Sequence, residues 1–338
     1  MEKFLKRLFE EETLSKKESK EIIHEIASGK HNHAHIASFL TVYLMRSITV
    51  DELSGFRDAL LDLALQIDLS DFNTVDLCGT GGDSKNTFNI STAASFVTAG
   101  SGQKVAKHGN YGVSSVSGSS NMLEHFGYSF TNNESALKRQ IDKANICFLH
   151  APLFHPAMKT VAPVRKELRM KTFFNLLGPL VNPAQPHSQL TGVYSYFVLD
   201  LYSDLFKQTN IKHSIVHSVD GYDEISLTSA AEVIQNNKYK VYNPEDLGLK
   251  QYKAQDLFGG NKVADSADIF ISVLEGKGSE AQTNVVLVNA AFALMTAQDI
   301  SFENAFEKAK ESLFGGNALK SFKTLIELSR HEYSGSHS

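Results

Sequence analysis

The stretch from residue 75 to residue 121 constrains the fold more than any other part of the chain. Val75, Leu77 and Cys78 predict a short buried strand, and a glycine-rich turn with the sequence GTGGD follows it. Glycine lets the backbone turn sharply and approach a ligand closely. The small and apolar residues from Thr92 to Gly100 predict a packed helix. Such a strand, turn and helix start present free backbone N–H groups, so this stretch predicts an anion site that suits phosphate.

A second polar loop follows the next predicted strand. Val105 and Ala106 are typical of a short strand, which leads into Lys107 and a glycine- and serine-rich segment ending near Asn121. Because the carboxyl ends of neighbouring strands in an open α/β sheet face one crevice, we expect both loops to share a ligand. GTGGD matches neither the dinucleotide nor the P-loop fingerprint, so neither nucleotide motif applies.

The predicted elements divide the chain into two parts. Residues 1–68 predict a small all-helical domain, in which Ser15 and Glu18 form a capping box. Residues 69–338 alternate apolar strands with helices, which predicts an α/β domain with a mostly parallel central sheet flanked by helices. Within it we expect a helix over residues 163–178, a β-hairpin around Asn236 and Asn237, and a disordered tail from residue 332.

Composition excludes several classes of protein. Of 338 residues, 42% are hydrophobic and 21% charged, and the formal net charge of −5 gives no footprint for nonspecific nucleic-acid binding. Two cysteines are too few for a disulfide scaffold and fit a reducing compartment. The first residues lack the apolar core of a secretory signal, and no apolar run reaches membrane-spanning length. We therefore expect a cytoplasmic enzyme with neither a nucleic-acid nor a membrane partner.

Three alternating histidines, His31, His33 and His35, invite a metal-site interpretation. Their surroundings predict a loop that enters a helix. This context favours solvated surface histidines over a metal site.

Spacing of the polar motifs is similar to that of a known family. GTGGD at residues 79–83, N-x-S-T at 89–92 and the KHGN segment at 107–119 are followed by HPAMK, FNLLGPLVNP and DGYDEIS, which ends at Ser226. This series resembles the anthranilate phosphoribosyltransferases of tryptophan biosynthesis, in the nucleoside phosphorylase/phosphoribosyltransferase fold family. The resemblance implies transfer of a 5-phosphoribosyl group from phosphoribosyl diphosphate to the amine of anthranilate. It also implies a homodimer that associates through the helical domain. Helices from about residues 163–185 are expected to be part of that domain.

The resemblance also implies a donor site and its metal. The metal is Mg²⁺, held by Ser91 and by the adjacent carboxylates of Asp223 and Glu224, which follow a predicted strand. Magnesium usually takes one or two carboxylates together with waters and phosphate oxygens. The expected phosphoribosyl diphosphate ligands are Gly79, Gly82, Asp83, Thr87, Asn89, Ile90, Ser91, Thr92, Lys107, His108, Gly109, Asn110, Ser114, Ser115 and Ser119.

For the acceptor, the resemblance implies that Arg165 binds the carboxylate of anthranilate through a bidentate fork. Asn110 would hold the amine beside Gly79. The walls of the ring site would come from His108, His150, His155, Met158 and Gly178. An arylamine is neutral and nucleophilic at pH 7, so positioning and leaving-group stabilisation suffice, and we assign no general base.

Four positions depart from the family pattern. Asn121 stands where an acidic residue is usual, Arg169 replaces a glycine, Lys171 replaces an arginine, and His150 replaces an aromatic residue. These departures bear on the acceptor pocket and leave the donor and metal motifs intact.

Two alternatives share the fold. Pyrimidine nucleoside phosphorylases carry K-H-S where this chain has K-H-G-N, and they lack the DGYDE carboxylates. A nucleic-acid-binding relative without transferase activity would show a basic surface and would have lost Arg165 or the carboxylates at 223 and 224. This chain is net acidic and keeps all three residues, which favours the transferase.

Overall fold

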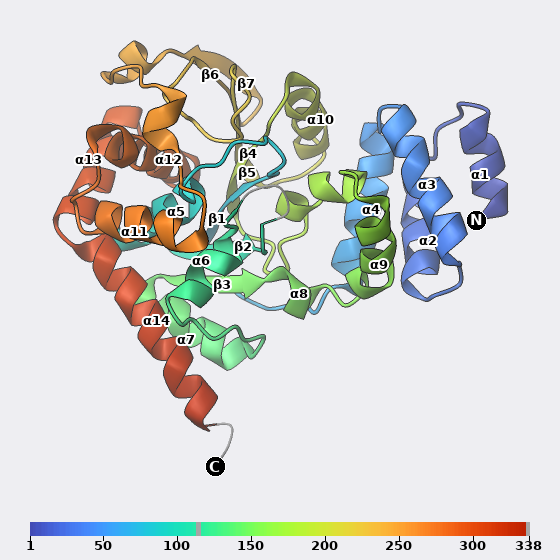
Figure 1. Ribbon diagram of the computed structural model, residues 1–338, viewed down its shortest axis with the longest axis horizontal. Coiled ribbons are helices and arrows are strands. Elements are labelled where there is room, and N and C mark those ends of the chain that lie inside the picture. Colours follow the sequence, from blue (N-terminus) through green and yellow to red (C-terminus); the bar gives the residue numbers. More distant parts are fainter. Residues whose placement is uncertain (113–115, 336–338) are drawn as a thin grey trace.

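The computed structural model describes residues 1–112 and 116–335, with side chains described up to residue 330. Figure 1 shows a helical lobe at the N-terminus beside a larger lobe built on a sheet. The N-terminal helices are α1 (Glu2–Phe9), α2 (Lys16–Ala27), α3 (His33–Met45) and α4 (Val50–Leu63). Helix α9 (Met158–Leu168) lies against α2 and α3, although it is far away in the sequence.

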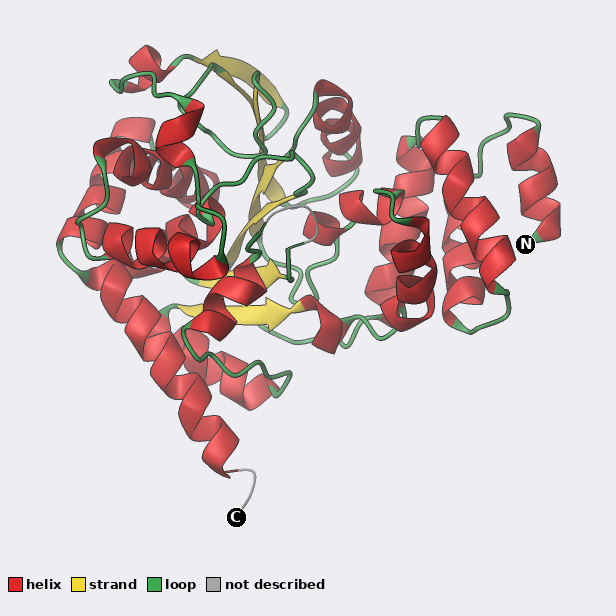
Figure 2. Cartoon of the chain, viewed as in Figure 1, coloured by secondary structure: helices red, strands yellow, loops and turns green. Residues whose placement is uncertain are grey.

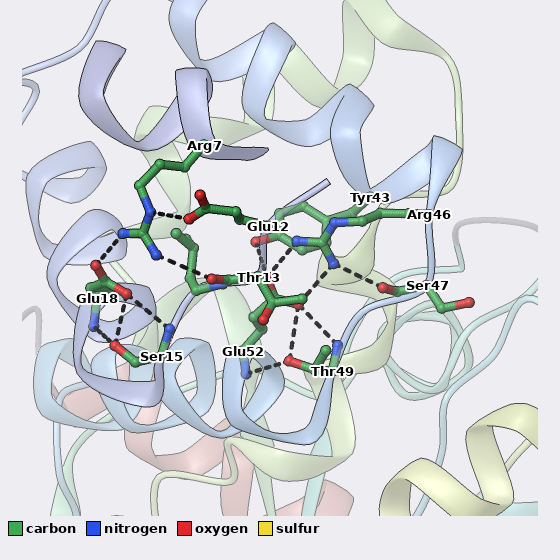
Figure 3. A network of polar contacts seen from close by, with 11 residues as sticks. Arg7, Glu12, Thr13, Ser15, Glu18, Tyr43, Arg46, Ser47, Thr49 and Glu52 are labelled. Carbon is green, nitrogen blue, oxygen red and sulfur yellow. Dashed lines mark hydrogen bonds and ion pairs between the residues drawn. The ribbon is translucent and has the colours of Figure 1, made fainter. Parts of the chain in front are cut away.

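The N-terminal helices begin at side-chain caps. The Ser15 hydroxyl accepts the N–H of Glu18, whose carboxylate accepts the N–H of Ser15, and Thr49 and Glu52 repeat this capping box. These caps belong to a polar network that ties the start of the chain to α2, α3 and α4 (Figure 3). The predicted capping box at Ser15 is confirmed.

One aromatic cluster forms the core of the helical lobe. Phe173, in the 3₁₀ turn η1 (Phe173–Leu176), stacks on Phe56 of α4 with ring centroids 4.5 Å apart. Phe39 and Tyr43 of α3 meet the same ring edge to face. Because η1 follows α9, this packing fixes the segment after α9 against the N-terminal helices.

The sheet has seven strands in the order β3-β2-β1-β4-β5-β6-β7 (yellow in Figure 2). The first five in this order are parallel, and β6 and β7 are antiparallel. The fold class is thereby confirmed, as is the hairpin, since Asn236 and Asn237 both have positive φ. The strands are β1 (Val75–Gly79), β2 (Val105–Gly109), β3 (Ile146–His150), β4 (Ser188–Gly192), β5 (Lys212–Ser218), β6 (Ala231–Gln235) and β7 (Lys238–Tyr242).

Helices cover both faces of the sheet. The longest of the buried helices is α12 (Glu280–Gln298), which is almost wholly apolar between Val285 and Met295. It packs on α5 (Ile90–Gly100), α13 (Phe302–Phe314) and β4. Within the described residues no single helix is long and apolar enough to cross a membrane; α12 and α13 pass that test together, with a bend of 120° between them. The remaining elements are α6 (Ser119–His125), α7 (Glu134–Ala144), α8 (Ala151–Phe154), η2 (Gly178–Leu180), α10 (Tyr196–Phe206), η3 (Pro244–Leu247), η4 (Ala254–Leu257), α11 (Val263–Leu274) and α14 (Asn317–Gly335).

Two predicted segments are wrong. The helix expected over 163–178 is α9, which begins at Met158, contains Pro163 and ends where Arg169 takes a left-handed conformation with φ of 52°. Proline is common in the first turn of a helix, which made residue 163 resemble a start. The tail expected to be disordered from residue 332 is helical through Gly335, and residues 336–338 lie outside the described part.

Candidate active site

A cavity of about 510 Å³ opens at the carboxyl ends of β1 and β2, with α9, η1 and η2 on its other side. Leu60 of α4 also lines it, so the helical lobe contributes to its wall. Most of the residues predicted for the donor line this cavity, namely Gly79, Gly82, Asp83, Thr87, Asn89, Ser91, Lys107, His108, Gly109, Asn110 and Ser119. Ser114 and Ser115 lie outside the described residues.

The glycine-rich loop after β1 is shaped by its contact with Asp223. The N–H of Gly81 donates to Asp223 Oδ2 at 2.6 Å, and a Cβ at Gly79 would overlap the same carboxylate. Gly81 and Gly82 have φ of 63° and 80°, a region that side chains rarely enter. Glycine at these positions therefore brings the loop backbone next to the carboxylates.

The start of α5 supplies one wall of the cavity. Ser91 lines the cavity, whereas the side chains of Ile90 and Thr92 are fully buried behind it. The structure thus places the Thr92 hydroxyl away from the cavity, and a donor contact from Ile90 or Thr92 would have to come from the backbone. Asn89, at the cap of α5, donates through Nδ2 to the carbonyl of Ser117 at 3.0 Å. This bond links the two predicted loops.

The second loop is braced by a residue that departs from the family pattern. Asn121 Oδ1 accepts the N–H groups of Gly112 and Gly118, each at 3.0 Å. A carboxylate could accept the same two bonds, so asparagine preserves the bracing. Lys107 is almost fully buried, and its Nζ donates to the carbonyl of Leu77 at 2.5 Å. In this structure the ammonium group therefore already has a backbone partner.

The side chains of Asp83, Asp223 and Glu224 all line the cavity. Burial, and then the nearby Asp83, raises the pKa of Asp223 to about 7, and burial raises the pKa of Glu224 well above its usual range. Glu224 Oε1 accepts the hydroxyl of Thr87 at 3.3 Å, while Glu224 Oε2 is buried without a hydrogen-bond partner among the described residues. Such crowded, poorly solvated carboxylates are well suited to a cation.

These residues fit a magnesium ion that the donor helps to bind. Among the described residues, no group of three or more His, Cys, Asp or Glu side chains is arranged to hold a metal. Mg²⁺ commonly uses only one or two carboxylates and completes its shell with water and phosphate oxygens. Asp223, Glu224 and the Ser91 hydroxyl line the same cavity as the glycine-rich loop, where those oxygens would lie.

On the opposite wall, Arg165 extends from α9 over the ring of Phe174, with 5.4 Å between its Cζ and the ring centroid. Its Nη2 donates to Asn175 Oδ1 at 3.3 Å, and among the described residues no charged group acts on its pKa besides burial. Burial lowers the pKa of Arg165, although a guanidinium stays charged at pH 7. A half-buried cation without a carboxylate partner suits an anionic ligand.

Two histidines form the wall beside it. Burial lowers the pKa of His108 to about 3 and that of His155 to about 4, so both rings are neutral at pH 7. Their ring centroids are 5.3 Å apart, and His108 Nδ1 lies 3.1 Å from the carbonyl oxygen of Gly178. Met158 and Gly178 line the same region. His150 does not line the cavity; its Nδ1 contacts Ser120 Oγ at 2.9 Å and its ring stacks on Phe130.

Several cavity residues were missed from the sequence. Lys85, whose Nζ lies 4.6 Å from the ring centroid of Tyr222, lies outside the motifs, whereas Tyr111 and Lys159 lie within the KHGN segment and HPAMK without having been assigned a role. Phe174 and Asn175 lie within FNLLGPLVNP, so this motif held a signal that went unassigned. Lys171 reaches across to the glycine-rich loop, where its Nζ donates to the carbonyl of Gly82 at 2.5 Å.

Comparisons with known proteins agree with this arrangement. Residues 2–64 match the helical bundle domain of a glycosyl transferase family, and residues 71–319 match the a/b domain of a glycosyl transferase family. The anthranilate phosphoribosyltransferase of Flavobacterium johnsoniae is 55% identical over 329 residues, which are 97% of this chain and 100% of that protein.

Solved structures are similar over the same length. The Saccharomyces cerevisiae anthranilate phosphoribosyltransferase in complex with PRPP and Mg matches with a TM-score of 0.90 and 27% identity, over 97% of each chain. The same enzyme in complex with 4-fluoroanthranilate matches with a TM-score of 0.87 and 26% identity, again over 97% of each chain. The sequence identity, the coverage of both lobes and the fold agree, and the chain belongs to the anthranilate phosphoribosyltransferase family.

Proposed function

We propose that the protein transfers the 5-phosphoribosyl group of phosphoribosyl diphosphate to the amine of anthranilate, a step of tryptophan biosynthesis. The observation that carries this proposal is one cavity that joins a glycine-rich loop, a crowded carboxylate pair and an arginine without a carboxylate partner. The products are N-(5-phosphoribosyl)anthranilate and diphosphate.

The donor lies on the side of β1 and β2. Backbone N–H groups of Gly79, Gly82 and Asp83, with the Ser91 hydroxyl, face its phosphate oxygens. Mg²⁺, when bound, neutralises charge on the leaving diphosphate. Asp223 and Glu224 hold that ion, and desolvation of their carboxylates disfavours their charged forms until a cation arrives.

The acceptor lies on the side of α9. Arg165 binds the anthranilate carboxylate, and Asn110 and Gly79 direct the amine toward the sugar. As the bond from the anomeric carbon to diphosphate breaks, the amine nitrogen forms a new bond to that carbon and then releases one of its two protons to water. His108 and His155 are weak bases because burial lowers the pKa of each ring, so we assign them to the walls of the acceptor site.

An activity measurement tests this proposal. Purified protein with phosphoribosyl diphosphate and Mg²⁺ should consume anthranilate, followed as a loss of its fluorescence. Turnover of a pyrimidine nucleoside with phosphate, or nucleic-acid binding without transfer, would replace the proposal by one of the two alternatives. The acidic net charge and the carboxylates at 223 and 224 weigh against both.

We also propose a cytoplasmic homodimer that associates through the helical lobe. Phe9 on α1 and Met45 on α3 are 64% and 85% exposed, and a dimer contact through the helical lobe would remove this apolar surface from water. Both cysteines are free, as expected in a reducing compartment. Sedimentation velocity of wild type beside Met45→Glu tests the interface: the proposal predicts a dimer that the charged variant weakens, and a wild-type monomer would contradict it.

A further inference from the structure

The backbone hydrogen-bond ladder of the sheet is open between the two strands that carry the donor loops. β1 pairs with β4 at five positions and β2 pairs with β3 at five, but β1 and β2 pair only at Val75 with Val105 among the described strand residues. Beyond that pair, the two strands approach the cavity without the regular bonds of a parallel ladder. The opening therefore lies directly beneath the glycine-rich loop and the segment that follows β2.

Side chains replace the missing backbone bonds. Asp76 Oδ1 accepts the N–H of His108 at 3.2 Å, and Asn182 Nδ2 donates to the carbonyl of Ala106 at 2.8 Å. The Asn182 amide also donates to Asp76 Oδ2 at 2.9 Å. From the other side, Lys107 Nζ donates to a carbonyl of β1, that of Leu77. We call Asp76, Lys107 and Asn182 the inter-strand wedge.

The side chains of the wedge are buried, and burying their charged groups costs free energy. Asp76, Lys107 and Asn182 are 0%, 2% and 3% exposed. Burial raises the pKa of Asp76 to about 6 and lowers the pKa of Lys107, so both charged forms are disfavoured. A regular ladder would satisfy the same backbone groups without a buried carboxylate, whose desolvation costs free energy. Because burial of these groups is unfavourable, we infer that the open ladder serves the function of the protein.

The wedge also reaches the acceptor wall. Asn182 lies two residues beyond η2, which contains Gly178, and the carbonyl of Gly178 contacts the ring of His108. The backbone of His108 is held by Asp76 and its ring by Gly178, so one network fixes the residue from both ends. Neither Asp76 nor Asn182 lines the cavity, so neither contacts a ligand directly.

We propose that Asp76 and Asn182 are positioning residues that hold β1 and β2 apart and so set the distance between the two donor loops. At that distance both loops contact one phosphoribosyl diphosphate molecule. Loss of the wedge lets the strands approach each other and misplaces the loops. This inference rests on the proposed function, since it assigns the two loops to that donor.

Donor binding and steady-state kinetics of Asn182→Ala and Asp76→Asn test the inference. Binding is measured by calorimetry with phosphoribosyl diphosphate and Mg²⁺ in the absence of acceptor. We expect Kd and KM for the donor to rise roughly tenfold or more, and kcat at saturating donor to change much less, because the lost free energy is that of loop placement. The matched control is Thr296→Val, which removes a buried 2.6 Å contact with Ser214 away from the cavity and should leave both constants unchanged.

Comparison of donor affinity with melting temperature separates positioning from simple stability. Asp76→Asn sets an amide N–H against either the N–H of His108 or the amide of Asn182, so its loss of donor affinity should exceed that of Thr296→Val even where the two variants lose the same melting temperature. Variants that lose melting temperature but keep the wild-type donor Kd would overturn the inference. If Asn182→Ala does not fold, Asn182→Ser keeps a hydroxyl donor and decides the question in the same way.

The outcomes for the two proposals differ. A wild type that binds the donor but transfers nothing to anthranilate contradicts the proposed function, and the same titrations of the variants still decide the wedge. A wild type that does not bind the donor at all overturns both.

Discussion

At the residue scale, Arg165 is the group to which we assign recognition of the acceptor's carboxylate. Arg165→Ala should raise KM for anthranilate by roughly 10- to 100-fold, since a hydrogen bond to a charged group is worth about 1.5–3 kcal/mol. Arg165→Lys should restore only part of the affinity for anthranilate, because lysine keeps the positive charge but lacks the planar guanidinium that can bind a carboxylate through two hydrogen bonds. Steady-state kinetics with the exposed neighbour variant Lys166→Ala as control check this, and an unchanged acceptor KM in Arg165→Ala would reject the assignment.

Arg169 carries a cost in backbone conformation. Its φ of 52° ends α9 in the left-handed region, where a side chain costs about 1–2 kcal/mol and glycine does not. Glycine also raises the entropy of the unfolded chain, which offsets part of this gain. We therefore expect Arg169→Gly to raise the free energy of unfolding, measured in urea, by about 0.5–1 kcal/mol. Lys166→Gly, inside the same helix, should destabilise it by about 1 kcal/mol. Equal effects of the two substitutions would contradict this account.

The cavity residues that could be assigned from sequence lie in motifs, although not every motif residue that lines the cavity was assigned. GTGGD and DGYDE predicted cavity residues because they occur together with the other motifs of the family that the chain resembles; a lone glycine cluster or acidic pair would have indicated an ordinary turn. The cavity positions of Lys85 and Tyr111 were missed, and so was the contact of Lys171 with the carbonyl of Gly82, because all three depend on tertiary contacts. Thr92 was placed in the site as part of N-x-S-T, although the helical turn buries its side chain.

At the scale of elements, one carboxylate joins three helices of the N-terminal lobe. Glu52 on α4 accepts hydrogen bonds from Tyr43, in the last turn of α3, and from Arg46, which follows that helix (Figure 3). It also accepts the backbone N–H of Leu14, which precedes α2. Burial alone would raise the pKa of Glu52, but Arg46 and the backbone N–H groups bring it below its usual value of 4.5. The charged form is thus favoured in the folded state.

This network predicts acid sensitivity. Because the folded-state pKa of Glu52 is depressed, its stabilisation is complete above pH 4.5 and is lost as the pH falls through the lower folded-state value. Glu52→Gln should destabilise the protein by about 3 kcal/mol at pH 7, since it leaves Arg46 without its partner, and should flatten the stability curve below pH 4.5. Denaturation from pH 7 to 3, with the exposed Glu21→Gln as control, checks this; parallel curves would contradict it.

Helices and strands with a regular pattern of apolar residues could be predicted from sequence. A helix whose pattern is interrupted by proline could not be placed correctly. The strands and the capped helices follow from their residues, whereas α9 was displaced because Pro163 resembles a helix start. Its true end at Arg169 depends on a backbone conformation that arginine rarely adopts, so no propensity could locate it.

At the scale of the whole molecule, the cavity joins the two lobes, with Leu60 on one side and the strand ends on the other. Ligands that bind there should stabilise the fold. Phosphoribosyl diphosphate with Mg²⁺, at a concentration of 100 times its Kd, should add about 2.7 kcal/mol and raise the melting temperature. Removing the metal with EDTA should abolish most of that rise in differential scanning fluorimetry. A rise of the same size without metal would contradict the assigned role of Asp223 and Glu224.

The central claim is that these two carboxylates and the glycine-rich loop serve phosphoribosyl transfer, and one assay tests it most directly. Anthranilate fluorescence is followed with phosphoribosyl diphosphate and Mg²⁺ for wild type, for Asp223→Asn/Glu224→Gln, and for the exposed pair Glu10→Gln/Glu11→Gln. We predict that wild type and the exposed-pair variant consume anthranilate at equal rates, and that Asp223→Asn/Glu224→Gln, folded by circular dichroism, loses at least about 100-fold in rate, or 2.7 kcal/mol. Full turnover by that variant, or none by folded wild type, would contradict the account.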